Sequence, residues 1–460
     1  MPIRTLSRKV DLLLFEAFDG GAYGDAGWRE DVGPEATLAR DQVASRSDPR
    51  VGRSSRHDGR MTNSRIGNQD STLRVAIVGC GNIAHQHARA YAASGRTELV
   101  GLVDIVPERA EAYADAYGGR TYPDLTSLMS EAYPDLVSVV TPPGAHADVA
   151  ATLLRAGASV LIEKPPCPTL AEFDIIAEAE RAGSGTAYVV FQHRHGSGAR
   201  RAAELLGSGA LGRPQIAVCE TLWYRPDSYF DPDWRGTWSG EGGGPTLGHG
   251  IHQIDLLLHL LGPWHHLTAI AVRQARPVEF EDVSLAVVRF EDGAVASVVN
   301  SLLSPRELSR IRIDTTAGTL EVNHVYGYSD ADWSFVPVPQ ASVAANLGKN
   351  PGTRGTTGAL GDSTPEVSDG ANDVWAASAG IDVPSNHAAQ ITRLVDDLHA
   401  GRTHQTTLAS TRSTVEFVSG VYASALLGRE ILREDLVAGH PFYADLSGGM
   451  AAEEITARMT

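Results

Sequence analysis

The chain has 460 residues, of which 42% are hydrophobic and 21% are charged, a composition typical of a globular protein and unlike that of fibrous or membrane-spanning chains. Its 39 basic and 56 acidic residues give a formal net charge of −17, which repels nucleic-acid phosphates and anionic lipids, so we predict neither a nucleic-acid nor a membrane partner. The three cysteines, Cys80, Cys167 and Cys219, form no C-x-x-C pair, a pattern that favours a reducing compartment, taken here to be the cytoplasm.

Residues 1–70 differ from the rest of the chain. They are rich in polar and charged residues, above all from residue 41 to residue 70, and show no sustained periodicity. Such a segment cannot bury enough apolar surface to offset the entropy of ordering it. We therefore expect residues 1–70 to be a disordered extension, or to precede a true start of the chain at Met61.

From residue 71 the chain alternates apolar runs with helical stretches. Runs typical of buried strands lie at residues 73–79, 98–104, 135–141, 159–165 and 187–192. Helical patterns lie between them at residues 82–94, from Pro107 onward, near 144–156 and at 169–182. Near-continuous apolar strands separated by helices indicate a sheet covered on both faces. We predict an α/β domain with a doubly wound parallel sheet over residues 71–195.

After about residue 213 the strands follow one another with little helix between them. They are expected at residues 215–224, 267–275, 283–290, 294–303 and 311–323, with a hairpin turn at 291–293 and helices near 250–261, 384–400 and 410–428. Residues 338–382 are rich in turn-forming residues and are predicted to be a long loop. We assign residues 196–445 to a second α/β domain with a mostly antiparallel, open sheet, which carries the substrate site and the contacts of an oligomer. Its C-terminal helix is expected to pack back on the first domain, and residues 446–460 to form a tail.

The first predicted strand ends in a glycine-rich turn, Gly79-Cys80-Gly81-Asn82-Ile83-Ala84, which leads into a helix. This G-x-G-x-x-A pattern lets the backbone approach a pyrophosphate that rests on the helix N-terminus. Asp104, which ends the next strand, would accept hydrogen bonds from the adenosine ribose and repel a 2′-phosphate, which favours NAD over NADP. The alternative is a glycine turn that binds no ligand.

Two further loops are predicted at the carboxyl edge of the same sheet, where open α/β sheets bind ligands. Thr141-Pro142-Pro143 follows one strand, with His146 in the next turn, and Glu163-Lys164-Pro165 ends the following strand. Lys164 could polarise the oxygen of an alcohol undergoing oxidation. The alternatives are a solvent-facing His146 at a helix start and a solvated Lys164 at a strand end.

The segments AIVGCGNIA, TPPGAH, IEKP and GGGPTLGHGIHQIDLLLHLLG together resemble the Gfo/Idh/MocA oxidoreductases, the glucose–fructose oxidoreductase and inositol dehydrogenase group, over residues 73–435. The resemblance implies a Rossmann domain and a substrate domain, NAD(P)-dependent hydride transfer at a sugar or cyclitol hydroxyl, and a homodimer or homotetramer. It also implies that Lys164 and His252 form the catalytic pair, with His252 as general acid/base. Two other readings stay open: a redox-neutral glycoside hydrolase or lyase that retains NAD, and a non-catalytic NAD-binding regulator.

From the residue pattern alone, His252 has two interpretations of equal weight: a titratable functional group at a helix start, or a buried structural histidine. His249, His252, Asp255 and His259 do not complete a ligand set, so we predict no metal. One position departs from the family pattern: Gly248 stands where the family has an aspartate. His249 or a water could take over its role, the substrate could lack the hydroxyl that this carboxylate holds, or the reaction could be altered or lost.

Aromatic and cationic residues gather in residues 223–238. Aromatic faces stack on sugar rings and arginines bind hydroxyl or carboxylate groups, whereas the alternative is a packed loop. The predicted substrate residues are Tyr224, Arg225, Trp234, Arg235 and His249. The predicted catalytic residues are Lys164, His252 and His249. The predicted cofactor residues are Gly79, Gly81, Asn82, Ile83, Asp104, Thr141, Pro142, His146, Glu163 and Lys164.

Overall fold

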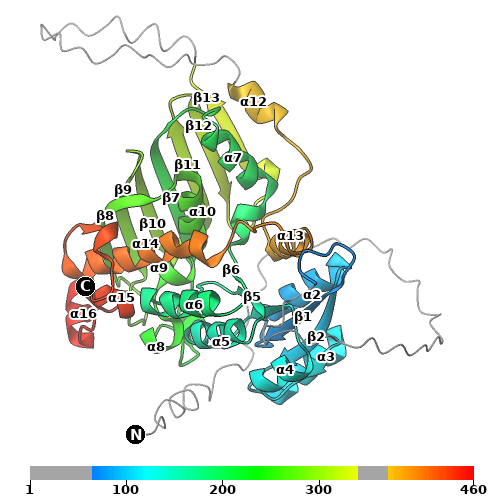
Figure 1. Ribbon diagram of the computed structural model, residues 1–460. Helices are drawn as coiled ribbons and strands as arrows, with labels where there is room; N and C mark the ends of the chain where they lie inside the picture. The colour runs from blue at the N-terminus through cyan, green and yellow to red at the C-terminus, as the bar shows by residue number, and fades with distance from the viewer. Residues whose placement is uncertain (1–64, 340–370) are drawn as a thin grey trace, which may run out of the picture. The chain divides into compact units, whose positions relative to one another are not determined.

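The computed structural model describes residues 65–339 and 371–460, which carry the helices and strands labelled in Figure 1. The expectation that residues 1–70 form a disordered extension therefore concerns, for residues 1–64, a segment outside the described part of the chain. Within the described residues, no helix combines the length and the apolar character that a membrane crossing requires.

The first sheet is parallel throughout, in the order β3-β2-β1-β4-β5-β6. Its strands are β1 (Leu73–Val78), β2 (Thr97–Val103), β3 (Arg120–Thr121), β4 (Leu136–Val139), β5 (Ser159–Ile162) and β6 (Ala187–Val189). Its helices are α2 (Ala84–Ser94), α3 (Pro107–Tyr117), α4 (Leu125–Glu131), α5 (Pro143–Arg155) and α6 (Leu170–Ala182). The predicted doubly wound α/β fold is confirmed. Only β3 and α4 were not expected, because two and seven residues are too short for a periodic signal.

Local sequence explains where these helices begin. Helices α3 and α5 start at a proline, whose fixed φ suits the first helical position and whose missing N–H costs nothing there. Helix α6 starts with a capping box, in which Thr169 and Glu172 each bond the other's backbone N–H. Helix α2 begins directly after the glycine-rich turn, and no side chain caps its N-terminus.

The second sheet is mixed and mostly antiparallel, in the order β13-β12-β11-β7-β10-β9-β8-β14, as expected for the second domain. Only β7 and β10 run parallel to each other. The strands are β7 (Pro214–Tyr224), β8 (Trp264–Val272), β9 (Val283–Phe290), β10 (Val295–Ser301), β11 (Leu303–Thr315), β12 (Gly318–His324), β13 (Trp333–Pro337) and β14 (Ile431–Leu432). The hairpin predicted at residues 291–293 joins β9 to β10, with Gly293 at a φ of 94°.

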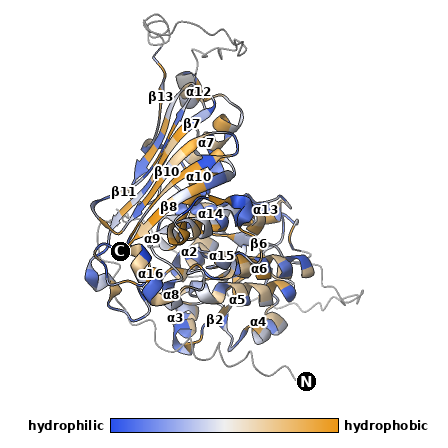
Figure 2. Ribbon diagram, turned by 90° about the vertical axis from the view of Figure 1, so that its left-hand side faces the viewer, coloured by the Kyte–Doolittle hydropathy of each residue, from blue (hydrophilic) through white to orange (hydrophobic). Residues whose placement is uncertain are grey.

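Helices α10 (Ile251–Leu261) and α14 (Leu408–Leu427) pack on this second sheet. The strands alternate buried and exposed residues, as in β9, because one face of the sheet meets the helices and the other does not. Hydrophobic residues, orange in Figure 2, run through the strands of the sheet.

Helix α13 (His387–His399), which comes late in the chain, lies beside α2 of the first domain (Figure 1). Its Ile391 and Leu394 share one buried apolar cluster with Tyr91 of α2 and Leu73 of β1. The two domains are thus joined by a helix that returns from the second to the first.

A buried ion pair links the short helix η1 (Gln192–His195), α10 and α14. Arg194 donates from Nε to Asp255 Oδ2 at 2.7 Å, and Thr414 of α14 donates its hydroxyl to Asp255 Oδ1 at 2.9 Å. The side chains of Arg194 and Asp255 are 5% and 0% exposed, so the carboxylate depends on these donors for its solvation. This pair holds α10, which carries His252, against the segment that follows β6.

Several segments differ from the expectations. Helix α7 (Ser197–Gly207) and strand β13 were not predicted, and helix α12 (Ala371–Ala377) lies inside residues 338–382, which were expected to be a loop. Residues 340–370 of that loop are outside the described chain. The expected tail, residues 446–460, contains helix α16 (Ala452–Met459), whose Ile455 and Met459 are buried because their four-residue spacing puts them on one face.

Candidate active site

The carboxyl edge of the first sheet begins with the glycine-rich turn after β1. Gly79 has a φ of 94°, and a Cβ on it would lie 2.6 Å from the carbonyl oxygen of Val140, so only glycine fits. A Cβ on Gly81 would meet no atom within 4 Å. Gly81 therefore borders open space, the arrangement expected where the backbone approaches a ligand. Burial raises the pKa of the Cys80 thiol to about 12, so this cysteine is a small filler between the glycines.

Asp104, at the end of β2, clamps the turn. Its Oδ2 accepts from the backbone N–H of Cys80 at 2.7 Å, and its Oδ1 accepts from that of Val106 at 2.8 Å. Asp104 is half-buried, and each carboxylate oxygen can accept a second hydrogen bond. The carboxylate thus positions the glycine-rich turn and can still bind a hydroxyl.

The N-terminus of α2 completes this part of the edge. Asn82 and Ile83 are exposed, the first turn of α2 contains no acidic residue, and no side chain caps the helix. The positive end of the helix dipole favours an anion there. Together with the space beside Gly81, these residues fit the pyrophosphate of a dinucleotide.

The loop after β4 is held by His146, which we expected to bind the cofactor. The Nδ1 and Nε2 atoms of His146 lie 2.8 and 2.7 Å from the carbonyl oxygens of Pro165 and Thr141. Both nitrogens are engaged and the ring is buried, so His146 joins the two loops, Thr141-Pro142 and Glu163-Lys164-Pro165, instead of facing a ligand. The hydroxyl of Thr141 is buried without a protein partner among the described residues and is free to contact a cofactor.

Glu163 ends β5 in a buried cluster with two histidines. Its Oε1 lies 2.8 Å from Nε2 of His87 on α2 and 3.0 Å from Nε2 of His387 on α13. Although burial acts to raise the pKa of Glu163, His387 and His87 hold it well below the usual value, so the group is a carboxylate. The N–O distances are those of hydrogen bonds, whereas ligands of a tetrahedral zinc at ~2.0–2.1 Å lie ~3.3 Å apart. Oε1 of Glu163, predicted to be a cofactor residue, is thus engaged by two histidines of the chain itself.

Lys164 points across the edge toward the second domain. Its Nζ donates to the backbone carbonyl of Gly248, at the end of α9 (Pro245–Gly248), at 3.1 Å. Burial lowers the pKa of Lys164, while Glu163 and Glu241 act to raise it. A Cβ on Gly248 would meet no atom within 4 Å. The missing side chain at this position therefore leaves open space next to the ammonium group of Lys164.

His252, in the first turn of α10, lies near the same point. Burial holds the pKa of His252 well below its usual value, and the charge of Lys164 lowers it further, so the imidazole is neutral. Its ring centroid is 5.1 Å from that of His193 and 5.6 Å from that of Tyr326. The structure thus brings Lys164 and His252, from different domains, to one place at the edge of the first sheet.

His249 lies beside this pair and next to the aromatic segment. Its ring meets Trp223 of β7 edge-on at 5.2 Å and lies 6.3 Å from Tyr229, in η2 (Asp227–Phe230). Burial is the main reason why the pKa of His249 lies well below its usual value, and the charges of Arg225, Lys164 and Arg235 lower it further. His249 is therefore a neutral hydrogen-bonding group in this structure.

The predicted substrate residues divide into two groups. Arg225 lies over the rings of Trp223 and Tyr229, and Arg235 lies over those of Tyr229 and Trp234, so Arg225, Arg235 and Trp234 belong to the group around His249. Tyr224 is 40% exposed and packs under Arg276. Adjacent residues of a strand point to opposite faces, which is why Trp223 takes the place expected for Tyr224.

Sequence reasoning missed several residues of the site. His193 follows β6 at the same carboxyl edge and could have been found from that rule alone. Tyr326, after β12, contacts His193, His252 and Trp223 through ring packing, and no sequence signal marked it. Glu241, at the end of α8 (Trp238–Glu241), and His387 were likewise recognised only from the structure.

Several buried polar atoms at this site have no protein partner within residues 65–339 and 371–460. They are Gln192 Oε1, His193 Nε2, His249 Nδ1, His252 Nδ1 and Gln253 Oε1. A buried polar atom left without a hydrogen bond costs about 1–3 kcal/mol, so such atoms are rarely left unpaired in numbers. A ligand rich in hydroxyl groups would satisfy them.

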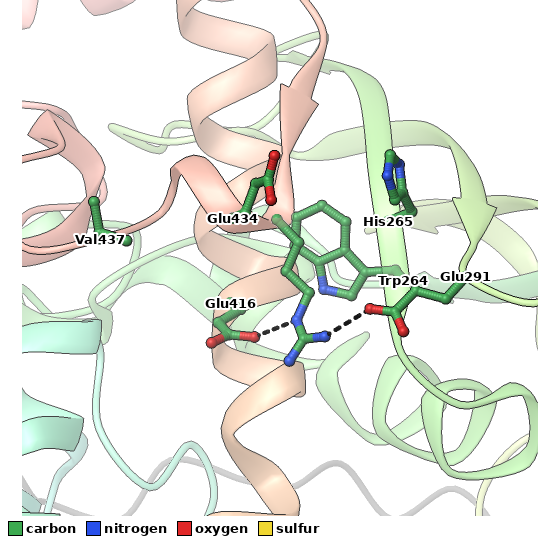
Figure 3. Close-up of a pocket in the computed structure, with 7 residues that line it drawn as sticks. Trp264, His265, Glu291, Glu416, Glu434 and Val437 are labelled. Atoms are coloured by element: carbon green, nitrogen blue, oxygen red, sulfur yellow. Dashed lines mark hydrogen bonds and ion pairs between the residues drawn. The ribbon is translucent and has the colours of Figure 1, made fainter.

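A pocket elsewhere in the second domain has a different character. It is lined by seven residues, Trp264, His265, Glu291, Glu416, Arg433, Glu434 and Val437, and Figure 3 draws them as sticks and labels all but Arg433. Arg433 bonds these carboxylates at 2.7 and 3.3 Å. None of the predicted site residues lines this pocket, so we place the active site at the sheet edge.

Two family models match the chain and together cover more than half of it. The first, described as an oxidoreductase family with an NAD-binding Rossmann fold, matches residues 73–191. The second, the GFO/IDH/MocA C-terminal domain, matches residues 199–321. These segments correspond to the first sheet and to most of the second.

Known proteins resemble the chain at low identity. D-glucoside 3-dehydrogenase of Escherichia coli is 28% identical over 301 residues, 60% of this chain and 84% of the relative. D-apiose dehydrogenase of Paraburkholderia graminis is 25% identical over 397 residues, 82% of this chain and 94% of the relative. The crystal structure of the WlbA dehydrogenase from Bordetella pertussis, in complex with NADH and UDP-GlcNAcA, has a TM-score of 0.65 and 25% identity, and the match covers 79% of this chain and 98% of that one.

The buried histidines of the site predict a pH dependence of stability. Burial lowers the pKa of His193 to about 3, so between pH 3 and 6.5 the unfolded chain binds a proton at this residue that the folded chain does not. Stability then falls with falling pH by about 1.4 kcal/mol per pH unit for this one group. We expect His193→Gln to flatten the fall in the free energy of unfolding between pH 6.5 and 5, measured by chemical denaturation.

The matched control is His265→Gln, which removes an exposed imidazole without emptying a buried position. An unchanged slope in His193→Gln would show that His193 is protonated in the folded protein and would contradict its role as a neutral group.

Proposed function

Since the chain belongs to the Gfo/Idh/MocA oxidoreductase family, we propose that it is an NAD-dependent dehydrogenase that oxidises a hydroxyl group of a sugar or cyclitol. One observation carries this proposal: at the carboxyl edge that also carries the glycine-rich turn, Lys164 Nζ bonds the carbonyl of Gly248, four residues before His252, and the charge of Lys164 helps to keep the imidazole of His252 neutral. The relatives named D-glucoside 3-dehydrogenase and D-apiose dehydrogenase support it.

The residues divide the reaction between them. The glycine-rich turn and Asp104 would hold NAD, which would supply the acceptor for the hydride of the carbon that carries the hydroxyl group. Lys164 donates a hydrogen bond to the hydroxyl oxygen and stabilises the negative charge that develops on it. His252 accepts the hydroxyl proton, for which it must be neutral, as its lowered pKa ensures. His193 Nε2 and His249 Nδ1 remain for the other hydroxyl groups of the substrate.

The Gly248 carbonyl takes part of the role of the aspartate found in the family. It accepts the hydrogen bond of Lys164 Nζ and so orients the ammonium group, although it cannot accept a proton. The open space beside Gly248 leaves room for a water or for a substituent of the substrate at this point.

Lys164→Ala should abolish turnover and leave the cofactor site intact. We expect kcat to fall by about 10²–10³-fold or more, because the variant loses its stabilisation of the developing oxyanion. NADH formation gives the rate, and calorimetric titration with NAD should give a Kd close to that of the parent protein. A variant that keeps the parent rate would remove Lys164 from the mechanism.

NAD is proposed as the cofactor in preference to NADP. The carboxylate of Asp104 can accept the ribose hydroxyls while it holds the glycine-rich turn, and it would repel a 2′-phosphate. Two residues hold the segments around the cofactor site in place: Glu163, which is bonded to two histidines, and His146, which joins two loops.

Asp104→Asn tests this preference, since the amide oxygen can still accept a backbone N–H. The loss of charge should raise the kcat/KM ratio of NADP to NAD by about 10-fold, the effect of removing one like-charge contact. Asp115→Asn, at an exposed position of α3, is the control and should keep the parent ratio. An unaltered ratio in Asp104→Asn would contradict the assignment of Asp104 to the ribose.

A second candidate function is redox-neutral cleavage of a glycoside with retained NAD, and Gly248 is the observation that favours it, because the usual carboxylate is missing there. A dehydrogenase accumulates NADH from a free sugar or polyol, whereas this activity releases the aglycone without net NADH. A non-catalytic regulator would do neither, and the presence of both Lys164 and His252 disfavours it.

We also propose that the open face of the second sheet pairs copies of this chain in a homodimer or homotetramer. Apolar residues exposed on this face include Ile216, Ile270, Leu285, Val287 and Val295. The strand register places them side by side, with Ile270 opposite Leu285 and Ile216 opposite Val295. An exposed apolar face of this kind is typical of an interface between subunits.

Val287→Lys should weaken this association, because Val287 is 67% exposed on the proposed interface and a lysine there would bury a charge. We expect light scattering to show a shift toward monomer at micromolar concentration. Ile175→Lys, at a residue 39% exposed on α6 of the first domain, is the control. A monomeric parent protein would contradict the proposal.

A further inference from the structure

We infer that the substrate is an uncharged sugar or cyclitol, because the arginines at the site are already neutralised by carboxylates of the chain itself. The inference rests on the proposed function and specifies its substrate class. It excludes sugar acids and nucleotide sugars, which would bring a carboxylate or a diphosphate to the site.

The first neutralised cation is Arg225, after β7. Its Nη1 pairs with Oε1 of Glu307 on β11 at 3.0 Å, and the same carboxylate oxygen accepts from the backbone N–H of Tyr224 at 3.1 Å. The side chains of Arg225 and Glu307 are 21% and 35% exposed, so the pair is only partly screened by water. Trp223 lies against the guanidinium and holds it in place.

The second neutralised cation is Arg235. Its Nη1 lies 3.5 Å from Oε1 of Glu241, while Oε2 of Glu241 accepts from the backbone N–H of Gly236 at 2.7 Å. The side chains of both residues are less than one-fifth exposed. Tyr229 packs against the guanidinium. Glu163 and Glu241 also act electrostatically on Lys164, the third cation near His249, and raise its pKa against the effect of burial.

The charges around His249 therefore balance among the described residues. Three cations, Lys164, Arg225 and Arg235, act on this histidine, and both arginines pair with a carboxylate. Lys164 donates to the Gly248 carbonyl and is assigned to the reacting hydroxyl group, so a substrate carboxylate or phosphate at this place would add a negative charge close to Glu241 and Glu307 without an unpaired arginine to receive it. The cost of burying an unpaired charge is high, whereas hydroxyl groups can use the neutral atoms of His193 and His249.

The test compares matched substrates with saturating NAD. Methyl glucoside and methyl glucuronide, and galactose and galacturonate, differ only by a CH₂OH or a carboxylate group, and UDP-glucose supplies the diphosphate. We expect kcat/KM, followed by NADH formation, to be at least about 10-fold higher for the uncharged member of each pair. Equal or higher kcat/KM for the anionic members, or for UDP-glucose, would overturn this inference alone. A lack of oxidation with every member would overturn the proposed function, and this inference with it.

Glu307→Gln tests the inference with a variant: it removes the negative charge that neutralises Arg225, while the amide oxygen can still accept from Tyr224 and Arg225. The ratio of kcat/KM for the uronate to that for its neutral partner should rise by about 10-fold. Glu241→Gln releases Arg235 and should move the ratio the same way, which keeps the test valid if one variant does not fold. Glu454→Gln, which opens the exposed Arg458–Glu454 pair of α16, is the control and should leave the ratio unchanged. An unchanged ratio in both site variants would overturn the inference.

Discussion

A single buried carboxylate, that of Glu163, is the contact on which the active-site edge depends. It ends β5, and its Oε1 is shared by His87 of α2 and His387 of α13. A buried carboxylate is costly unless donors surround it, so the three elements can pack only in the arrangement that brings these donors together. Lys164 is the next residue, and its backbone N–H also bonds Glu163, at 3.1 Å. The ammonium group of Lys164, which points toward the second domain, is therefore positioned by hydrogen bonds inside the first domain.

Two other buried contacts hold the opposite side of the site. The pair Arg194–Asp255 holds α10, and with it His252, against the segment after β6. His146 joins the two loops that follow β4 and β5. In each case a titratable residue that resembles a catalytic group has a positioning role, because its polar atoms already bond other parts of the chain. The groups left without protein partners, such as those of His193, His249 and His252, are the ones suited to a ligand.

Much of this edge could be predicted from the sequence. The strands of a parallel sheet end at one edge, so the order of strands along the chain was enough to bring Gly79, Asp104, Thr141 and Lys164 together. The predictions for the second domain were less precise at the level of side chains. A shift of one residue along β7 exchanges Trp223 for Tyr224, and ring contacts such as those of Tyr326 join segments about 70–130 residues apart along the chain. No local pattern carries that information.

The sequence by itself determined the fold class, the glycine-rich turn with its acidic partner, and the family to which the chain belongs, since these depend on local periodicity and on motifs a few residues long. Only the tertiary structure decided which polar groups are left for a ligand and which are hydrogen-bonded or ion-paired within the protein. Whether Glu163 meets two histidines, or Arg225 meets Glu307, depends on contacts between elements far apart in the chain. Hydrogen bonds and ion pairs act only over a few ångströms, so the chemistry of the site is set by packing.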